Sequence, residues 1–534
     1  MRSSDIKSTL VHSKGGIVAA FVIIGLGLLL GGRSIDRVPS SIHSWAQSDW
    51  YAIALGFTHN GYDLFHPETM IYNKQFPSMW KEASNDTVTS ADFPIHGYII
   101  ALLMGLFGTT APWVYRLWTL LCSLVGMWFL YLLGRRVTKS GLKAITVVTV
   151  AMLSPLYAYY FANYLPSAPA VACVLAGLWA YIKHRQEGSD PYWHLAMSLL
   201  TLGAMIRTSQ AVVLVAVCGF ELLRIIRHET TFWNKVPAVL LSAAAIGGYL
   251  LWNAHLRAEH GTLFLSDLLP LRGWNDIAIS WQRYSTVYFS LPQQILILAL
   301  TVAAVIFAIV NRKSRRSYSR TLPLWLLWSI WFFGELLFLM AMGYQFIDHE
   351  YYFLDSFYLP AIVGMTLLAK HIPLPTKTIW QAVTLACMLA ALWPMYRATD
   401  RLLDERSQGW DLALICHNNY HGSDQWLDEL GIGRDARILS VASYPQNPPF
   451  LLMGRKGYTA QWMGDGYDMS PMLTSALQFP FDYVITEEWY LKERFDQYRV
   501  VFERLKPVAS YGALWLCTAA DTVVNSGPDD FFTQ

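Results

Sequence analysis

Residues 43–54 read His-Ser-Trp-Ala-Gln-Ser-Asp-Trp-Tyr-Ala-Ile-Ala, a stretch that places one carboxylate among aromatic and apolar side chains. Ser44 followed three residues later by Gln47 is the pattern of a capping box, which predicts that a helix begins near Trp45. Asp49 would then lie in the second turn of that helix. A carboxylate near a helix N-terminus is also stabilised by the helix dipole. The position of Asp49 therefore fits either a structural or a chemical role.

The composition is that of a membrane protein. Of 534 residues, 54% are hydrophobic and 15% are charged, whereas soluble globular proteins contain ~25% charged residues. The 22 Trp and 29 Tyr residues suit the aromatic belts at a membrane surface. No basic patch stands apart from the loops between apolar segments, and no pair of cysteines has zinc-finger spacing. We therefore expect no nucleic-acid partner and no metal.

Apolar segments follow one another along most of the chain, and those near the length of a membrane span predict about eleven crossings. A further segment at 94–108 is too short for a comfortable span, so we expect a helix lying at the outer interface. The predicted crossings are 16–32, 113–134, 144–160, 168–182, 193–206, 211–223, 236–252, 291–310, 322–342, 357–369 and 378–395.

Lysine and arginine residues gather in alternate loops, as the positive-inside rule requires of cytoplasmic loops. The N-terminal segment and five later loops, such as the one at 312–320, agree with a single topology. That topology places the N-terminus in the cytoplasm. With an odd number of crossings, the C-terminus lies outside.

The sequence predicts two domains. Residues 1–395 would form the transmembrane domain, with 33–111 as a long first outer loop, and 396–534 a small extracytoplasmic α/β domain. We expect strands at 437–442, 483–487 and 513–517 and helices at 424–430 and 491–505. Two cysteines in this region, Cys416 and Cys517, either form a disulfide or are simply buried.

Arginine residues on the outer side run against the topology rule and need an explanation. Each can snorkel to the lipid headgroups, or can bind phosphate oxygens through charge-assisted hydrogen bonds. Such arginines beside a carboxylate suggest a binding site for a lipid phosphate. The candidates are Arg116, Arg207, Arg257, Arg272 and Arg283.

The first outer loop resembles that of the GT-C glycosyltransferases, in the branch that contains protein O-mannosyltransferases and lipid A aminoarabinose transferases. The resemblance rests on residues 43–49, on Asp92-Phe93-Pro94-Ile95-His96, on Arg116-Leu117 and on His349-Glu350-Tyr351-Tyr352. It covers residues 15–395, while the C-terminal domain is similar only in a general way to the outer domain of bacterial relatives.

The resemblance implies a polyprenyl-phosphate-sugar donor, no cofactor, and Asp49 as the catalytic base. It also implies a bacterial inner membrane location with the C-terminal domain in the periplasm. Several relatives have a lysine where this chain has Arg207, so the charge is kept and the residue type is not. The acceptor is a lipid, a glycan or a protein. Side chains expected to line the sugar or acceptor pocket are His43, Trp45, Asp92, His96, His349, Tyr351 and Tyr352.

The expected reaction is an inverting transfer without a metal, in which arginines stabilise the departing lipid phosphate. Asp348, His349 and Glu350 are consecutive, so they do not easily converge on one metal ion. The main alternative is a transporter or flippase of a lipid-linked glycan, which would need ionisable groups deep in its spans; Glu221 and Glu335 are the few candidates. A non-catalytic relative with a glycan-binding outer domain is a third possibility.

Overall fold

The chain folds into two compact units, each drawn from separate stretches of sequence. The helical unit contains residues 1–35, 116–249 and 267–405, and the mixed unit contains residues 36–115, 250–266 and 406–534. The computed structural model describes residues 14–265, 267–310, 312–375, 377–408, 412–444, 446–461, 468–488, 498–499 and 503–520.

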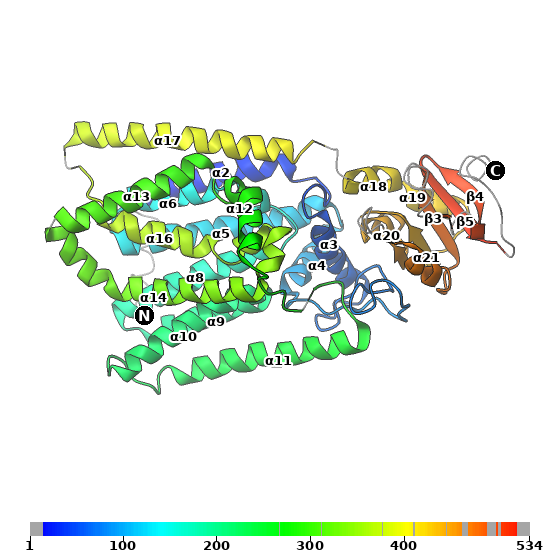
Figure 1. Cartoon of the computed structure of the whole chain (residues 1–534), viewed down its shortest axis with the longest axis horizontal. Helices are drawn as coiled ribbons and strands as arrows, with labels where there is room; N and C mark the ends of the chain where they lie inside the picture. The colour runs from blue at the N-terminus through cyan, green and yellow to red at the C-terminus, as the bar shows by residue number, and fades with distance from the viewer. Residues whose placement is uncertain are drawn as a thin grey trace. The chain divides into compact units, whose positions relative to one another are not determined.

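The helical unit is built from long helices that run roughly parallel to one another (Figure 1). Helices α8 and α9 make the most extensive contact, and α10 packs on α14. The helices are α2 (Lys14–Gly31), α5 (Pro112–Thr138), α6 (Gly141–Met152), α7 (Pro155–Tyr160), α8 (Ser167–Glu187), α9 (Asp190–Ile206), α10 (Ala211–Ile226), α11 (Val236–His260), α12 (Trp274–Tyr288), α13 (Leu291–Val310), α14 (Arg312–Met342), α15 (Tyr351–Leu354), α16 (Tyr358–His371) and α17 (Thr378–Glu405).

Among the described residues, five helices are long and apolar enough to cross a membrane, or six if one bent pair is a single span. Several of the predicted crossings are shorter. Helix α16 has 14 residues, about 21 Å at 1.5 Å per residue, which is less than the ~30 Å hydrocarbon core. A membrane protein with several apolar spans is confirmed, and the number eleven stays a prediction. The candidate spans are Gly15–Ser34, Pro112–Thr138, Thr208–Ile226, Val236–His260 and Leu322–Ile347, with Trp274–Tyr288 and Leu291–Phe307 forming the pair bent by 92°.

The segment at 144–160 is not one continuous helix. Helix α6 ends at Met152, and α7 begins at Pro155 after Ser154, whose side chain accepts a hydrogen bond from the backbone N–H of Tyr157. Proline is well suited to the first turn of a helix and poorly suited to the interior. The serine cap and the proline together therefore end one helix and start the next.

The mixed unit contains a five-stranded sheet with the order β2-β1-β3-β5-β4. Strand β1 (Ile438–Val441) pairs in parallel with β2 (Gly457–Ala460) and with β3 (Tyr483–Glu487). Strand β5 (Leu514–Ala519) pairs antiparallel with β3 and with β4 (Leu505–Tyr511). The helices of this unit are α3 (Ser44–His59), α4 (Ile95–Phe107), α18 (Leu412–Tyr420), α19 (Ser423–Glu429), α20 (Pro448–Met453) and α21 (Ser470–Ala476).

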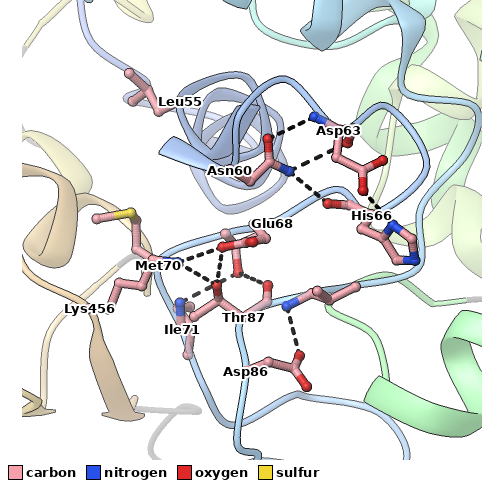
Figure 2. Close-up of polar contacts among 12 residues, drawn as sticks. Leu55, Asn60, Asp63, His66, Glu68, Met70, Ile71, Asp86, Thr87 and Lys456 are labelled. Carbon is pink, nitrogen blue, oxygen red and sulfur yellow. Dashed lines mark hydrogen bonds and ion pairs between the residues drawn. The ribbon is translucent and has the colours of Figure 1, made fainter. Parts of the chain in front are cut away.

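The first outer loop joins the open edge of β2, although the two are almost 400 residues apart. Gly457 donates its backbone N–H to Met70 and accepts one from Tyr72, at 3.0 and 2.8 Å. Lys456 Nζ lies 2.5 Å from Glu68 Oε2 and 2.8 Å from Thr87 Oγ1 (Figure 2). Gly457 is required here, because a Cβ would lie 1.8 Å from the carbonyl oxygen of Ile438. The loop and the C-terminal sheet therefore share one core.

The C-terminal predictions hold in part. The three expected strands correspond to β1, β3 and β5, and the expected helix at 424–430 to α19, whereas β2 and β4 were not predicted. Most of the expected helix at 491–505 lies outside the described residues. Cys416 and Cys517 are both buried free thiols, so the simple burial reading is correct and the disulfide is not formed.

Candidate functional site

Asp49 lies in the second turn of α3 and is 2% exposed. Its Oδ1 accepts hydrogen bonds from Gln446 Nε2 at 2.6 Å and from Asn447 Nδ2 at 2.8 Å. Both donors lie in the loop after β1, and both are completely buried. Among the described residues, no group donates to Oδ2. One oxygen of Asp49 is therefore fixed by two neutral amides, while the other accepts no hydrogen bond from a described residue.

The helix that carries Asp49 begins differently from the predicted capping box. Its N-cap is His43, in a left-handed conformation with φ of 57°, and no side chain caps the helix. Gln47 instead donates its side-chain amide to the carbonyl of Ile42 at 2.7 Å. The predicted start of the helix is confirmed, and the predicted role of Ser44 as N-cap is wrong because Ser44 is already inside the first turn.

Burial sets the electrostatics of Asp49. Removal from water raises the pKa of its carboxyl well above the usual value, while the amides of Asn447 and Gln446 lower the pKa by a smaller amount. No charged side chain contributes to the shift among the described residues. A carboxylate with a raised pKa is a stronger base, which is what a general base needs near neutral pH.

Aromatic rings lie beside Asp49. Trp45 precedes it by one helical turn and therefore shares its face of α3. The Trp45 ring centroid lies 6.2 Å from that of Trp80 and 6.2 Å from that of Tyr444, the latter edge-on. Trp80 is fully buried, whereas Trp45 and Tyr444 are half-buried. Aromatic side chains thus border the polar surroundings of Asp49, and two of them, Trp45 and Tyr444, are only half-buried.

The second predicted block is in the same unit. His96 is buried on α4, with its ring 5.3 Å from that of Tyr115, and burial lowers its pKa to about 3. His96 is therefore a neutral imidazole at physiological pH. Asp92 is half-buried, and the backbone N–H of its neighbour Ala91 donates to Asn253 at 3.0 Å.

Arg257 also belongs to the mixed unit, where it lines a polar hollow of about 790 Å³. Lys74 and His260 lie on the same wall, and Asp86 and Glu82 contribute carboxylates. Burial lowers the pKa of Lys74 to about 7. The hollow therefore has charged groups of both signs.

The other four predicted arginines are in the helical unit. Arg207, at the C-terminal end of α9, pairs with Asp355 through two nitrogens, one of them Nε at 2.9 Å. Asp355 is completely buried. The guanidinium carbon also lies 5.7 Å from the ring centroid of Tyr351. Arg207 is thus held by a buried ion pair that the sequence did not predict.

Two more arginines contact the same segment, 343–355. Arg283 donates to Asp348 Oδ1 at 2.9 Å, and the Arg272 guanidinium lies 3.5 Å from the ring centroid of Tyr344. Together with Arg207, these contacts bring three of the predicted arginines to one segment.

The aromatic residues predicted for the pocket lie within that segment. His349 is next to the rings of Tyr351 and Tyr352, at centroid distances of 5.5 and 6.1 Å. Burial lowers the pKa of His349. Glu350 is completely buried and accepts a hydrogen bond from Tyr160 at 3.4 Å.

Arg116 is buried near the start of α5. It donates to the carbonyl of Ala162 at 2.8 Å and to Ser34 Oγ at 3.4 Å, and its guanidinium carbon lies 4.7 Å from the ring centroid of Tyr164. These contacts lie outside the segment 343–355 that Arg207, Arg272 and Arg283 contact. A group of three or more side chains suited to hold a metal ion is not found among the described residues.

Sequence reasoning missed Gln446, Asn447 and Asp355. The two amides follow a short strand and lie 397 and 398 residues from Asp49, so no local spacing connects them. Asp355 could have been noticed, because an ionisable residue among the apolar segments of a membrane protein commonly pairs with another ionisable residue.

Comparisons with known proteins agree with this architecture. Residues 91–252 match the family model described as dolichyl-phosphate-mannose-protein mannosyltransferase. No curated protein matches the chain by sequence. The structure resembles that of ArnT from Cupriavidus metallidurans with 11% identity and a TM-score of 0.60, covering 94% of this chain and 98% of ArnT.

Two further solved structures have similar folds. The Archaeoglobus fulgidus oligosaccharyltransferase has 12% identity and a TM-score of 0.52, with 97% of this chain and 76% of the other covered. The mycobacterial arabinofuranosyltransferase AftD has 13% identity and a TM-score of 0.55, with 96% and 40% covered. At such identities the likeness is one of fold. The resemblance seen in the first outer loop is thereby confirmed, and the chain has the fold of the GT-C glycosyltransferases.

Proposed function

We propose that the protein is a glycosyltransferase that moves a sugar from a polyprenyl-phosphate-sugar donor to an acceptor hydroxyl on the extracytoplasmic side of the membrane. The proposal rests above all on Asp49, a buried carboxylate with one oxygen fixed by two amides and the other available. The donor class is supported by neighbours of the same fold, since ArnT has been solved with undecaprenyl phosphate and an archaeal oligosaccharyltransferase with dolichol-phosphate.

In the proposed reaction Asp49 Oδ2 takes the proton of the acceptor hydroxyl. The acceptor oxygen forms a bond to the anomeric carbon as the bond from that carbon to the phosphate oxygen breaks. The products are the glycosylated acceptor and a polyprenyl phosphate, and a single displacement inverts the anomeric centre. General-base assistance typically contributes about 10²–10⁴-fold to the rate.

Negative charge grows on the departing phosphate, and arginine side chains are suited to receive it. We propose that Arg116, Arg207, Arg257, Arg272 and Arg283 supply the phosphate-binding groups. Because a monophosphate leaving group carries less charge than a diphosphate, we expect these side chains to suffice without a metal. His43, Trp45, Asp92, His96, His349, Tyr351 and Tyr352 remain proposed pocket residues.

A transporter or flippase is the less favoured reading. It would give no role to the fixed geometry of Asp49, and two of the fold neighbours are named as sugar transferases, an oligosaccharyltransferase and an arabinofuranosyltransferase. The two readings differ in their product, because transport leaves the sugar on its lipid and transfer does not.

The direct experiment follows radiolabelled polyprenyl-phosphate sugars incubated with purified protein and cell-envelope extract. Transfer of label to the extract with release of polyprenyl phosphate is the expected result, and Asp49→Asn should reduce it by about 10²–10⁴-fold. Asp63→Asn is the matched control, because Asp63 is a half-exposed carboxylate of the same loop, paired with His66. Equal transfer by Asp49→Asn and the wild type would remove Asp49 as the base.

A further inference from the structure

The carboxyl edge of the parallel strands has the form of a ligand site. From β1 the chain passes through α20 to β2 on one side, and β3 follows α21 to the other side of β1. The strand order therefore reverses at β1. In open α/β sheets, ligands bind outside the carboxyl ends of the strands at such a switch point.

Polar side chains gather on one face of this edge. The register pairs Ser440 of β1 with Thr459 of β2, so their side chains share one face of the sheet. Gln461 directly follows the last residue of β2. All three residues are completely buried. The Tyr420 hydroxyl of α18 forms hydrogen bonds with the hydroxyls of Ser440 and Ser443, so Tyr420 covers this face.

The loop after β1 connects this edge with Asp49. It begins at Ala442, whose φ of 64° is a conformation that residues with a Cβ rarely adopt. Such local strain concentrates at functional sites. The loop then carries Gln446 and Asn447 to the carboxylate of Asp49.

Several polar atoms here have no hydrogen-bond partner among the residues that the structure describes. They are Thr459 Oγ1, both side-chain polar atoms of Gln461, and Gln446 Oε1. Each of these residues is 0% exposed. Buried polar groups are normally hydrogen-bonded because desolvation is otherwise uncompensated, so these four atoms indicate that a hydrogen-bonding partner is missing.

The chemistry of the cluster indicates what that partner is. Amides and hydroxyls offer both donors and acceptors without charge, which matches the hydroxyls of a sugar. Asp49 and the buried Glu487, whose Oε2 accepts from Asn419 at 2.6 Å, would repel an anion. The half-buried Trp45 and Tyr444 offer apolar faces at the rim.

We propose that the carboxyl edge of β1 and β2 binds the ring of a neutral sugar through Gln461, Thr459 and Gln446. The inference rests on the proposed function and deepens it, because it makes the acceptor a glycan whose hydroxyl is presented to Asp49.

The test uses saturation-transfer NMR to measure binding of methyl α-D-mannopyranoside and methyl α-D-glucopyranoside to the full-length protein in detergent. We expect a signal from at least one sugar and none from a Ser/Thr tripeptide. Gln461→Leu and Thr459→Val should each weaken binding at least tenfold. Thr486→Val is the matched control, because Thr486 is equally buried, its hydroxyl is also unpartnered, and its pairing with Val441 puts it on the other face of the sheet.

Stability separates a binding role from a structural one. Replacing an unpartnered buried amide by an apolar group of similar size is neutral or stabilising, so Gln461→Leu should keep or raise the melting temperature while it loses the sugar. Asp49→Asn should still bind the sugar, which separates this inference from the proposed catalysis. No sugar signal from the wild type, a signal from the peptide alone, or equal binding by Thr459→Val and Thr486→Val would overturn the inference.

Discussion

Two carboxylates of this protein are buried to nearly the same degree but have different partners. Asp49 is 2% exposed and accepts hydrogen bonds from two neutral amides. Asp355 is 0% exposed and is paired with the guanidinium of Arg207. The charge of Asp355 is balanced and that of Asp49 is not, which is why burial raises the pKa of Asp49. Asp355 thus has a charged partner and Asp49 only neutral ones, and it is this difference on which the proposed role of Asp49 as a base depends.

Removal of the positive partner should have the largest effect on stability. Arg207→Ala leaves Asp355 as an unpaired buried carboxylate, which typically costs about 3–5 kcal/mol. The double variant Arg207→Met with Asp355→Leu should recover most of that loss, because an apolar pair replaces the ion pair without leaving a charge. Chemical or thermal unfolding of the detergent-solubilised protein measures both.

The same two variants test whether Arg207 binds polyprenyl phosphate. If the double variant is stable but has lost affinity for polyprenyl phosphate, Arg207 binds the donor as proposed. If stability and affinity both return, the arginine serves only to balance Asp355, and it should be dropped from the phosphate-binding set.

Loss of one amide should act on Asp49 through its pKa. Asn447→Leu removes a donor that favours the charged form, and a hydrogen bond to a charged group is worth about 1.5–3 kcal/mol, or roughly 1–2 pH units. The amide lowers the pKa, so its removal raises it. The acid limb of kcat/KM should therefore move to higher pH, with activity recovered in alkaline buffer.

A change in the opposite direction, or a loss of activity that no pH restores, would show that Asn447 does not act through the ionisation of Asp49. Asn418→Leu is a suitable control, because Asn418 is an exposed asparagine of the same unit and is not among the donors to Asp49.

The smallest effect is expected from reducing agents. Cys416 and Cys517 are free thiols in the core of the mixed unit, and burial raises the pKa of Cys517 to about 12, which disfavours the reactive thiolate. The melting temperature should be the same with and without dithiothreitol. A fall in the melting temperature on reduction would reveal a disulfide.

The membrane-protein class could be predicted from the sequence, because the length of apolar segments follows directly from the membrane as a solvent, whereas the number of crossings and the topology stay predictions. The helix at Asp49 was predicted to begin within a residue of its true start. Its cap was not, because the N-cap position is occupied by His43 in a left-handed conformation, and no side chain makes the capping hydrogen bond that the Ser44 pattern predicted. The break between α6 and α7 could have been predicted from Ser154 and Pro155 alone.

The partners of the site residues were beyond reach of local patterns. Gln446 and Asn447 meet Asp49 only through the fold, and β2 escaped notice because four residues with a leading glycine give little strand signal. The arginines were predicted from their charge and location. Their buried ion-pair partners, such as Asp355, depend on packing. Sequence spacing predicts contacts within one helical turn or one strand. It does not predict contacts with a loop that is distant in the sequence.

The proposal that Asp49 accepts a proton during glycosyl transfer is best tested by the pH dependence of kcat/KM. We expect wild-type transfer to fall on an acid limb at a pH above the ordinary range of an aspartate, because burial raises the pKa of Asp49. The residual transfer by Asp49→Asn should lack that limb. If the rate stays constant down to pH 4, or if Asp49→Asn keeps the same acid limb, Asp49 is not the base.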